Sequence, residues 1–231
     1  MSATTAVELT EESPQTPSCA MSRTGNVVWR MLEVLASAMA LLLLMPMMLI
    51  LAVAIRLDSD GPVLFRQKRL GRSQSTFTVY KFRTMRHGAG DDVHRAFVRG
   101  LIAGEEPSIV EGKPRFKLTG DPRVTRVGSL LRRTSLDELP QLWNVLRGQM
   151  SLVGPRPSIA YEVEHYPPPW LERFAVKPGL TGLWQVSGRS ELTMQDMVAL
   201  DIDYVHRRSV RLNIWILIRT VPAVLSLRGA S

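Results

Sequence analysis

The sequence has few of the residues on which thiol and metal chemistry depend. Its 231 residues include one cysteine, Cys19, so a disulfide within the chain is impossible. A lone cysteine also excludes every zinc site that needs two or more thiolates. The four histidines show no metal-ligand spacing, and neither a P-loop nor a GxGxxG motif is present. These absences exclude disulfide frameworks, zinc fingers and the common glycine-rich nucleotide sites.

Aromatic and acidic residues are also scarce. Aromatics make up 6% of the chain, and 21 acidic residues face 29 Lys and Arg, which gives a formal net charge of +8. Such an excess favours a polyanionic partner: nucleic acid, anionic lipid or a phosphorylated substrate. Because no spaced aromatic–basic platform is present, nucleic acid is the least favoured of the three. The 45% hydrophobic content excludes a wholly disordered chain.

The chain divides into three parts by composition. Residues 1–22 are rich in Ser, Thr, Pro and Glu and lack an apolar period, which predicts a disordered tail. Residues 23–57 contain the one long apolar run and form a predicted membrane segment. Residues 58–231 form the third part, which the basic residues just after the membrane segment are expected to keep in the cytoplasm.

The membrane segment allows two topologies. Val34 to Ile55 is free of charged residues and would be about 33 Å long as a straight helix, enough to cross a bilayer. Pro46 favours a bend, which would allow a re-entrant hairpin within one leaflet. Basic residues flank both ends, as expected when both ends are cytoplasmic. Spanning helices also tolerate proline, so the residues alone leave both topologies open. A signal peptide is disfavoured by the length of the run and by the preceding tail.

The remaining pattern predicts an α+β fold that is mostly helical. Val63–Arg69 and Thr76–Arg83 are expected to form a small β-hairpin. Thr193–Val205 is expected to be an amphipathic helix, with Thr193 as its cap and Asp196 at the third helical position. Leu212–Leu227 is apolar but broken by Arg219 and Pro222, which indicates a core or interfacial helix rather than a span.

The segment around Asp137 and Glu138 is the first candidate for chemistry. Two arginines, Arg132 and Arg133, precede this pair of carboxylates. Ser135 and Glu138 have the spacing of a capping box for a helix that would run to Arg147 and end at Gly148. A helix N-terminus beside arginines also binds phosphate and keeps carboxylates ionised. Spacing alone leaves capping and catalysis open.

Two further segments carry cations on stiff or glycine-rich backbone. Pro155 and Pro157 fix the backbone on either side of Arg156, which would present its guanidinium rigidly to a phosphate or carboxylate. The stretch from Lys177 to Arg189 contains three glycines between its terminal cations, so its backbone can approach a ligand closely. A stiff surface turn and a turn leading to a buried strand are the respective structural alternatives.

Taken in order, these segments resemble the bacterial sugar transferase family. Its members are monotopic phosphoglycosyl transferases that begin glycan assembly on a polyprenol phosphate. The resemblance runs from about Asn26 to the C-terminus. Besides the segments above, it rests on Gly61–Gly71 (GPVLFRQKRLG), Tyr80–Met85 (YKFRTM) and Thr119–Arg123 (TGDPR).

The resemblance implies a role for individual residues. The membrane helix would be re-entrant and bent at Pro46, and residues 58–231 would be a cytosolic, membrane-associated catalytic domain. Asp137 would be the nucleophile, with Glu138 beside it, and the two would hold Mg²⁺. Phosphate-binding residues would be Arg132, Arg156, Lys81 and Arg83. A nucleotide-side or other part of the site would include Pro155, Pro157, Lys177 and Arg189.

The resemblance also implies a reaction and its partners. A sugar 1-phosphate, of glucose or galactose, would pass from a UDP-sugar to undecaprenyl phosphate through a phosphosugar–aspartate, with release of UMP. This would be the first step of exopolysaccharide assembly, on the inner leaflet of the bacterial cytoplasmic membrane and facing the cytoplasm. No nucleic acid partner is expected, and the oligomeric state is left open, a dimer included. The alternative is a membrane-anchored polyanion-binding protein without catalysis.

Overall fold

The computed structural model describes residues 21–88, 100, 108–110, 113–115, 121–188 and 192–225. Residues 1–20 of the predicted tail therefore lie outside the described residues. The helices are α1 (Arg23–Asp58), α3 (Arg126–Thr134), α4 (Gln141–Leu146), α5 (Ala160–Val163), α6 (Leu183–Ser187), α7 (Met194–Arg207) and α8 (Val210–Leu225). Short 3-10 turns are η1 (Arg72–Gln74), η2 (Leu136–Glu138) and η3 (Pro168–Ala175). The strands are β1 (Leu64–Leu70), β2 (Thr76–Phe82), β3 (Ser108–Val110), β4 (Lys113–Arg115), β5 (Ser151–Val153) and β6 (Gly179–Thr181).

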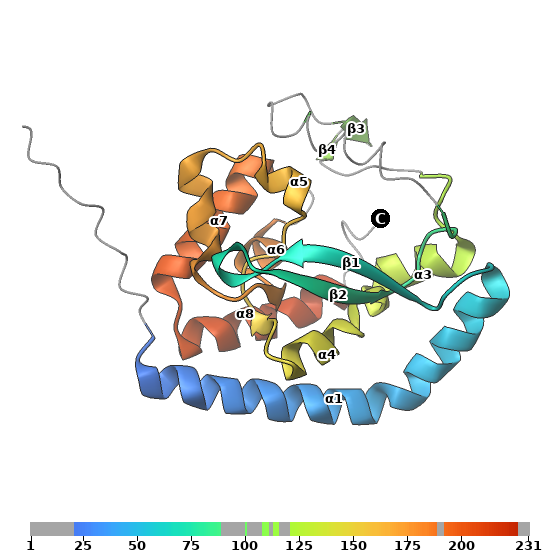
Figure 1. The fold of residues 1–231 in the computed structure, drawn as a ribbon, viewed down its shortest axis with the longest axis horizontal. Coiled ribbons are helices and arrows are strands. Elements are labelled where there is room, and N and C mark those ends of the chain that lie inside the picture. The colour runs from blue at the N-terminus through green and yellow to red at the C-terminus, as the bar shows by residue number, and fades with distance from the viewer. Residues whose placement is uncertain are drawn as a thin grey trace, which may run out of the picture.

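The first helix is continuous over 36 residues, with Pro46 inside it. Figure 1 shows that α1 curves around one side of the domain instead of projecting from it. Among the described residues it is the one helix long and apolar enough to cross a membrane. A re-entrant hairpin with two separate arms is not confirmed, because the structure shows one curved helix.

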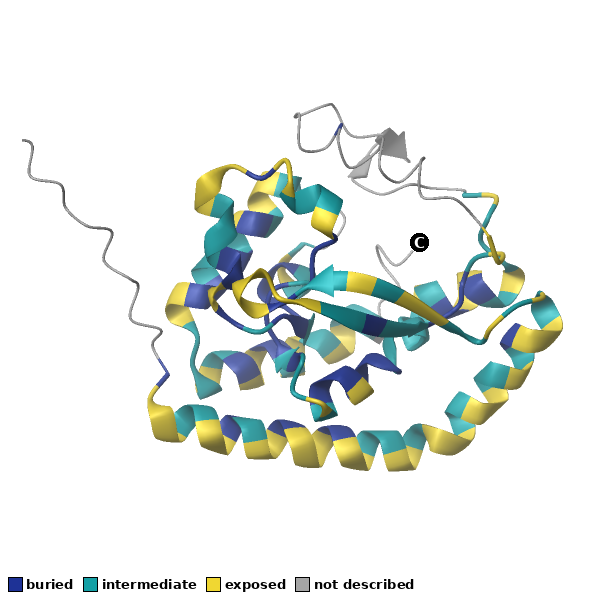
Figure 2. Cartoon of the chain, viewed as in Figure 1, coloured by how far each residue is buried: buried dark blue, intermediate teal, exposed yellow. Residues whose placement is uncertain are grey.

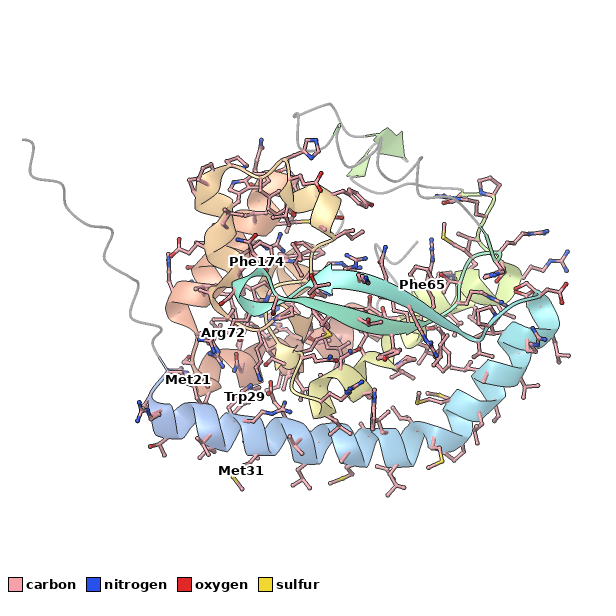
Figure 3. The ribbon with its side chains drawn as sticks, in the orientation of Figure 1. Met21, Trp29, Met31, Phe65, Arg72 and Phe174 are labelled. Carbon is pink, nitrogen blue, oxygen red and sulfur yellow. The ribbon has the colours of Figure 1, made fainter. Side chains whose placement is uncertain are left out.

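The two faces of α1 differ in exposure. Trp29, Glu33 and Ser37, spaced four residues apart, are buried against the domain. Figure 2 shows the buried positions of α1 on its inner side and exposed positions along its outer side. In Figure 3, Trp29 points toward the domain and Met31, which is 67% exposed, points away from it. The outer face is therefore an uncovered apolar surface along most of the helix.

The predicted hairpin is confirmed. Strands β1 and β2 pair antiparallel, with Leu64 opposite Phe82 and Leu70 opposite Thr76. The hairpin crosses the middle of the domain in Figure 1. Its base is buried because Phe82 packs with Ile55 of α1 and Leu131 of α3. The hairpin thereby fixes the end of α1 relative to the helices that follow.

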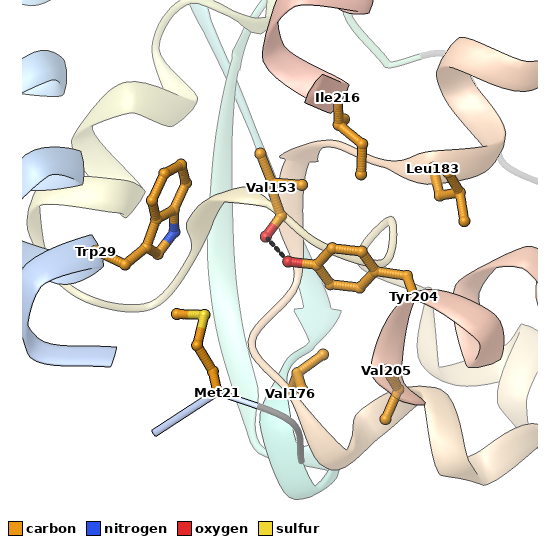
Figure 4. Packing of buried hydrophobic residues seen from close by; sticks show 8 residues of the cluster. All are labelled: Met21, Trp29, Val153, Val176, Leu183, Tyr204, Val205 and Ile216. Atoms are coloured by element: carbon orange, nitrogen blue, oxygen red, sulfur yellow. Dashed lines mark hydrogen bonds between the residues drawn. The ribbon is translucent and has the colours of Figure 1, made fainter. Parts of the chain in front are cut away.

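A larger core lies between the other end of α1 and the C-terminal helices. Figure 4 shows its members, among them Trp29 of α1, Val153 of β5 and Tyr204 of α7. The Tyr204 hydroxyl donates to the Val153 carbonyl oxygen at 3.0 Å. Beside this core, β5 and β6 form a short parallel pair. The core thus joins the start of α1, the parallel strand pair and α7.

The C-terminal helices match their predicted positions. In α7, Thr193 and Asp196 form the expected capping box, with the Asp196 amide donating to Thr193 Oγ1 at 3.1 Å. In α8, Ile216 is fully buried while Trp215 and Ile218 are exposed. One face of α8 therefore packs in the core, and another face leaves apolar side chains exposed. Its placement at a membrane interface stays a prediction.

Candidate active site

The carboxylates Asp137 and Glu138 lie in η2, a single turn between α3 and α4. Ser135 adopts left-handed backbone (φ 57°) and its side chain caps nothing in this turn. The capping-box interpretation is therefore wrong: Glu138 does not reach back to Ser135 but contacts Lys81. Helix α4 begins after Pro140, later than a cap at Ser135 would place it. Gly148, with φ 75°, follows the end of the helix, as the sequence predicts.

Glu138 is held by two cations from distant parts of the chain. Lys81 Nζ on β2 donates to Glu138 Oε1 at 2.6 Å, and Arg156 NH1 lies 3.5 Å from the same oxygen. Burial raises the pKa of Glu138, but Lys81 and Arg156 outweigh burial and hold the pKa at about 2. Burial also lowers the pKa of Lys81, an effect that Glu138 opposes. Glu138 is thus a paired carboxylate that is ionised at neutral pH.

Asp137 has a different environment from its neighbour. Its carboxylate makes no hydrogen bond or ion pair with another residue that the structure describes. Burial raises its pKa, and the negative charge of Glu138 adds to this rise. Lys81, Arg132 and Arg156 act in the opposite direction. Asp137 is therefore a partly buried carboxylate, surrounded by positive charge but with its oxygens uncommitted.

Arg132 reaches the site because α3 lies very close to the end of β2. Gly128 makes this approach possible, since a Cβ there would lie 2.1 Å from the carbonyl oxygen of Thr84. Arg132, one turn further on, donates from Nε to Thr84 Oγ1 at 2.9 Å. Burial lowers the pKa of Arg132, and Asp137 raises it. Thr84 thus orients the Arg132 guanidinium, which lies close enough to Asp137 for the two charges to interact.

The backbone around Arg156 is fixed by contacts on both sides. The Gly179 amide donates to the Pro155 carbonyl oxygen at 2.8 Å. Arg69 donates to the Pro157 carbonyl oxygen at 2.9 Å, and Arg173 donates to the carbonyl oxygen of Arg156 itself at 3.1 Å. Pro155 and Pro157 thus act on the site by fixing Arg156, which supports the prediction of a rigidly presented guanidinium.

Comparison of the sequence with known proteins identifies the family of this chain. The model of the family described as bacterial sugar transferase matches residues 24–227, which is most of the chain. The chain belongs to the bacterial sugar transferase family. The expectation drawn from the ordered motifs is thereby confirmed.

Three relatives illustrate the range of the family. The exopolysaccharide production protein ExoY of Sinorhizobium fredii is 39% identical, over 99% of this chain and 97% of the relative. The UDP-glucose:undecaprenyl-phosphate glucose-1-phosphate transferase of Caulobacter vibrioides is 41% identical, over 87% of this chain and 71% of the relative. The undecaprenyl-phosphate galactose phosphotransferase of Salmonella typhimurium is 39% identical, over 90% of this chain and 42% of the relative.

Not every residue singled out in the transferase sequence reaches the carboxylates. Arg83 is buried and donates to the carbonyl oxygens of Ser59 (2.6 Å) and Asp60 (2.8 Å) just after α1. It therefore closes the end of α1 and does not face the site. Lys177 lies beside Arg30 and Gly148, near the start of α1, and burial lowers its pKa. Arg189 lies outside the described residues.

Two residues that organise the transferase site were not predicted. Arg69 of β1 holds Pro157 and lies beside Arg156; burial, followed by the charge of Arg156, lowers its pKa to about 10. Asn144 of α4 is fully buried, donates to the Thr78 carbonyl oxygen at 2.7 Å and accepts from the Tyr80 amide at 3.2 Å. It extends the ladder of β2 and so fixes Lys81 relative to Glu138. Arg69 does lie within the GPVLFRQKRLG motif, which was the available signal.

Proposed function

We propose that this protein transfers a sugar 1-phosphate from a UDP-sugar to undecaprenyl phosphate, with Asp137 as nucleophile. The observation that carries the proposal is the asymmetry of the two adjacent carboxylates. Glu138 is paired with Lys81 and Arg156, whereas Asp137 is uncommitted among the described residues. A nucleophile needs free oxygen lone pairs, and Asp137 has them.

The reaction proceeds in two displacements at one phosphorus atom. An Asp137 carboxylate oxygen attacks the sugar-bearing phosphorus of the UDP-sugar, and the bond to the bridging oxygen breaks, so that UMP leaves with the electron pair. A phosphate oxygen of undecaprenyl phosphate then attacks the same phosphorus and breaks its bond to Asp137. The products are undecaprenyl diphosphate sugar and the regenerated carboxylate. Splitting the transfer separates the two anionic substrates in time.

The cations around the dyad fit this chemistry. Four cationic side chains, those of Arg69, Lys81, Arg132 and Arg156, act electrostatically on the two carboxylates or on each other. They leave an excess of positive charge where phosphates would bind. Preorganised positive charge is the main means by which proteins stabilise phosphoryl transfer. We assign contact with substrate phosphate to Arg156 and Arg132.

Asp137 and Glu138 are the residues that would hold Mg²⁺. The described residues contain no group of three or more His, Cys, Asp or Glu side chains able to hold a metal alone. Magnesium is commonly bound by one or two carboxylates while substrate phosphates and water supply the other ligands, so the dyad fits. The ion would supply charge neutralisation at the phosphates.

The donor sugar is proposed to be glucose or galactose. Relatives of nearly equal identity carry glucose and galactose in their names, so identity does not separate the two. Two relatives that match over 89% and 97% of their own length are named exopolysaccharide production protein, which supports a role at the start of exopolysaccharide assembly. Family membership favours this enzyme over a noncatalytic polyanion binder.

The packing of α1 supports a monotopic placement on the cytoplasmic face of the inner membrane. The start of α1 packs on the domain through Trp29, and its end packs on the domain through Ile55. A bilayer cannot separate two ends that contact one polar domain. The exposed apolar outer face of α1 would therefore enter one leaflet, with both ends of the helix on the same side.

The test is UMP release by detergent-solubilised protein with Mg²⁺, undecaprenyl phosphate and a panel of UDP-sugars. We expect release with one hexose donor, loss of release after chelation of the metal, and loss in Asp137→Asn. Asp203→Asn, which alters a surface ion pair on α7, is the matched control and should keep full activity. Without acceptor, the wild type should gain the mass of a phosphosugar and Asp137→Asn should not. Full activity of Asp137→Asn would refute the assignment of Asp137 as nucleophile. If folded wild-type protein released no UMP with any donor, the proposed reaction would be refuted.

A further inference from the structure

The membrane helix carries one buried carboxylate, Glu33, which the proposed reaction does not use. Glu33 is 3% exposed and lies in the half of α1 that packs on the domain. A carboxylate in an apolar helix is costly to bury unless its oxygens are fully bonded. Its partners therefore indicate why it is there.

Glu33 is bound to β5 through one oxygen. Oε1 accepts from the Leu152 amide at 2.8 Å, from the Ser151 hydroxyl and from Trp29 Nε1 at 2.8 Å. Ser151 and Val153 are the β5 residues paired with β6. Successive amides of a strand point to opposite sides, so the Leu152 amide points away from β6 and has Glu33 as its acceptor. Glu33 thus takes the place of a neighbouring strand along the free edge of β5.

The segment that Glu33 holds leads directly to Arg156. Gly154 follows β5 and its amide donates to the Thr181 carbonyl oxygen at 2.9 Å. Pro155 and Arg156 come next, so only a few stiff residues separate the Leu152 amide from the cation that contacts Glu138. A shift of β5 would therefore be passed on to the Arg156 guanidinium.

The second oxygen of Glu33 leads to α4. Glu33 Oε2 lies 3.5 Å from Arg30 NH1, and Arg30 NH2 donates to the carbonyl oxygens of Val145 (2.8 Å) and Leu146 (3.1 Å). These are last-turn carbonyls of α4, the helix that follows the dyad. One carboxylate on α1 is therefore connected to both segments that carry the reacting groups.

We propose that Glu33 is a positioning residue that fixes Ser151–Pro157 and thereby sets the position of Arg156 against Glu138. The proposal rests on the transferase function proposed above. It makes α1 part of the active-site support as well as the membrane anchor. Glu33 itself touches no substrate and acts through β5 and Arg156.

The first test is hydrogen–deuterium exchange, which does not depend on activity. Glu33→Gln keeps the side-chain volume and the oxygen that faces β5, but it removes the negative charge that strengthens the three hydrogen bonds and sets an amide NH₂ against the Arg30 guanidinium. We expect at least tenfold faster exchange in the peptide covering 151–157. Ser37→Ala is the matched control: Ser37 lies one turn further on the same face, is buried, and its hydroxyl has no hydrogen-bond partner among the described residues. It should exchange like the wild type. Unchanged exchange in Glu33→Gln would overturn the proposal.

The second test is a double-mutant cycle on kcat/KM for the UDP-sugar. Glu33→Gln should lower kcat/KM by about tenfold or more, mainly through KM, and combination with Arg156→Lys should add less than twofold to the loss of Arg156→Lys alone. Multiplicative losses, or full activity of Glu33→Gln, would overturn the positioning role. If Glu33→Gln does not fold, Ser151→Ala removes one donor and should show the same non-additivity with a smaller loss. If wild type transfers no sugar, the reaction fails and the exchange result alone decides the role of Glu33.

Discussion

Removal of the Lys81 charge tests the electrostatic reasoning behind the site. Lys81 Nζ lies 2.6 Å from Glu138 Oε1 and also lowers the pKa of Asp137. Lys81→Met keeps an apolar chain of similar length but leaves two adjacent carboxylates with one cation fewer. A missing positioned charge of this kind costs about 10² to 10³ in kcat. We expect a loss of that size at pH 7.5.

The pH dependence gives the sign of the effect. An opposite charge at this distance lowers the pKa of a carboxyl by about 1 to 3, so without Lys81 the pKa values of both carboxyls rise. The pKa of Glu138 would move from about 2 toward its ordinary value of 4.5. Asp137, whose pKa burial already raises, would then be protonated at higher pH than in the wild type. A protonated carboxyl is not a nucleophile, so the acid limb of the kcat profile should move to higher pH.

The assay is UMP release between pH 5 and 9 for the wild type, Lys81→Met and Lys68→Met. Lys68 is an exposed cation on the same hairpin and serves as the control for loss of a positive charge. Its profile should match the wild type within about twofold, because exposed charges are screened by solvent and salt. An unshifted acid limb in Lys81→Met, or an equal shift in Lys68→Met, would refute the reasoning.

Three further predictions concern the frame of the site and its membrane side. Arg83→Lys should lower the melting temperature by about 4 to 12 °C, because hydrogen bonds to the end of α1 worth roughly 2 to 3 kcal/mol are lost. The KM for the donor should stay unchanged. A raised KM with an unchanged melting temperature would instead indicate that Arg83 binds phosphate. Asp201→Asn should destabilise the protein by about 3 to 5 kcal/mol in a denaturant titration, because it leaves the buried Arg173 guanidinium unpaired; a loss below about 1 kcal/mol would contradict this. Cys19, which precedes α1, should resist a membrane-impermeant maleimide in intact cells and react in inside-out vesicles, and labelling from outside would indicate a spanning helix.

Features with a local signal could be predicted from the sequence. Two β-rich runs on either side of a loose turn predicted the hairpin, and the Thr193 cap predicted the start of α7, because both signals depend on residues only a few positions apart. The dyad and Arg132 are also neighbours in sequence, so their proximity required no knowledge of the fold. The motifs identified the family because each one is a short run of neighbouring residues that can be read without the fold.

Features that depend on long-range packing could not be predicted. Lys81 and Arg83 are two residues apart, which in a strand puts both side chains on one face. However, β2 ends at Phe82, so Arg83 turns away to the end of α1 while Lys81 faces Glu138. Ser135 and Glu138 have the spacing of a capping box, but Lys81, 57 residues away in sequence, takes the Glu138 carboxylate. The bond between Glu33 and Leu152 joins residues 119 positions apart and has no local sequence signal.

The contact of both ends of α1 with one domain has a consequence for how the acceptor is found. Because the helix is held at Trp29 and at Ile55, the proposed placement of α1 in one leaflet would fix the height of the dyad above the bilayer through the fold and not through a flexible tether. The proposed acceptor, whose tail remains in the leaflet, would then need no extraction and would reach the enzyme by lateral diffusion. The second half-reaction should therefore respond to the mole fraction of undecaprenyl phosphate in the membrane, and diluting it with inert lipid should slow turnover even when its amount per volume is unchanged.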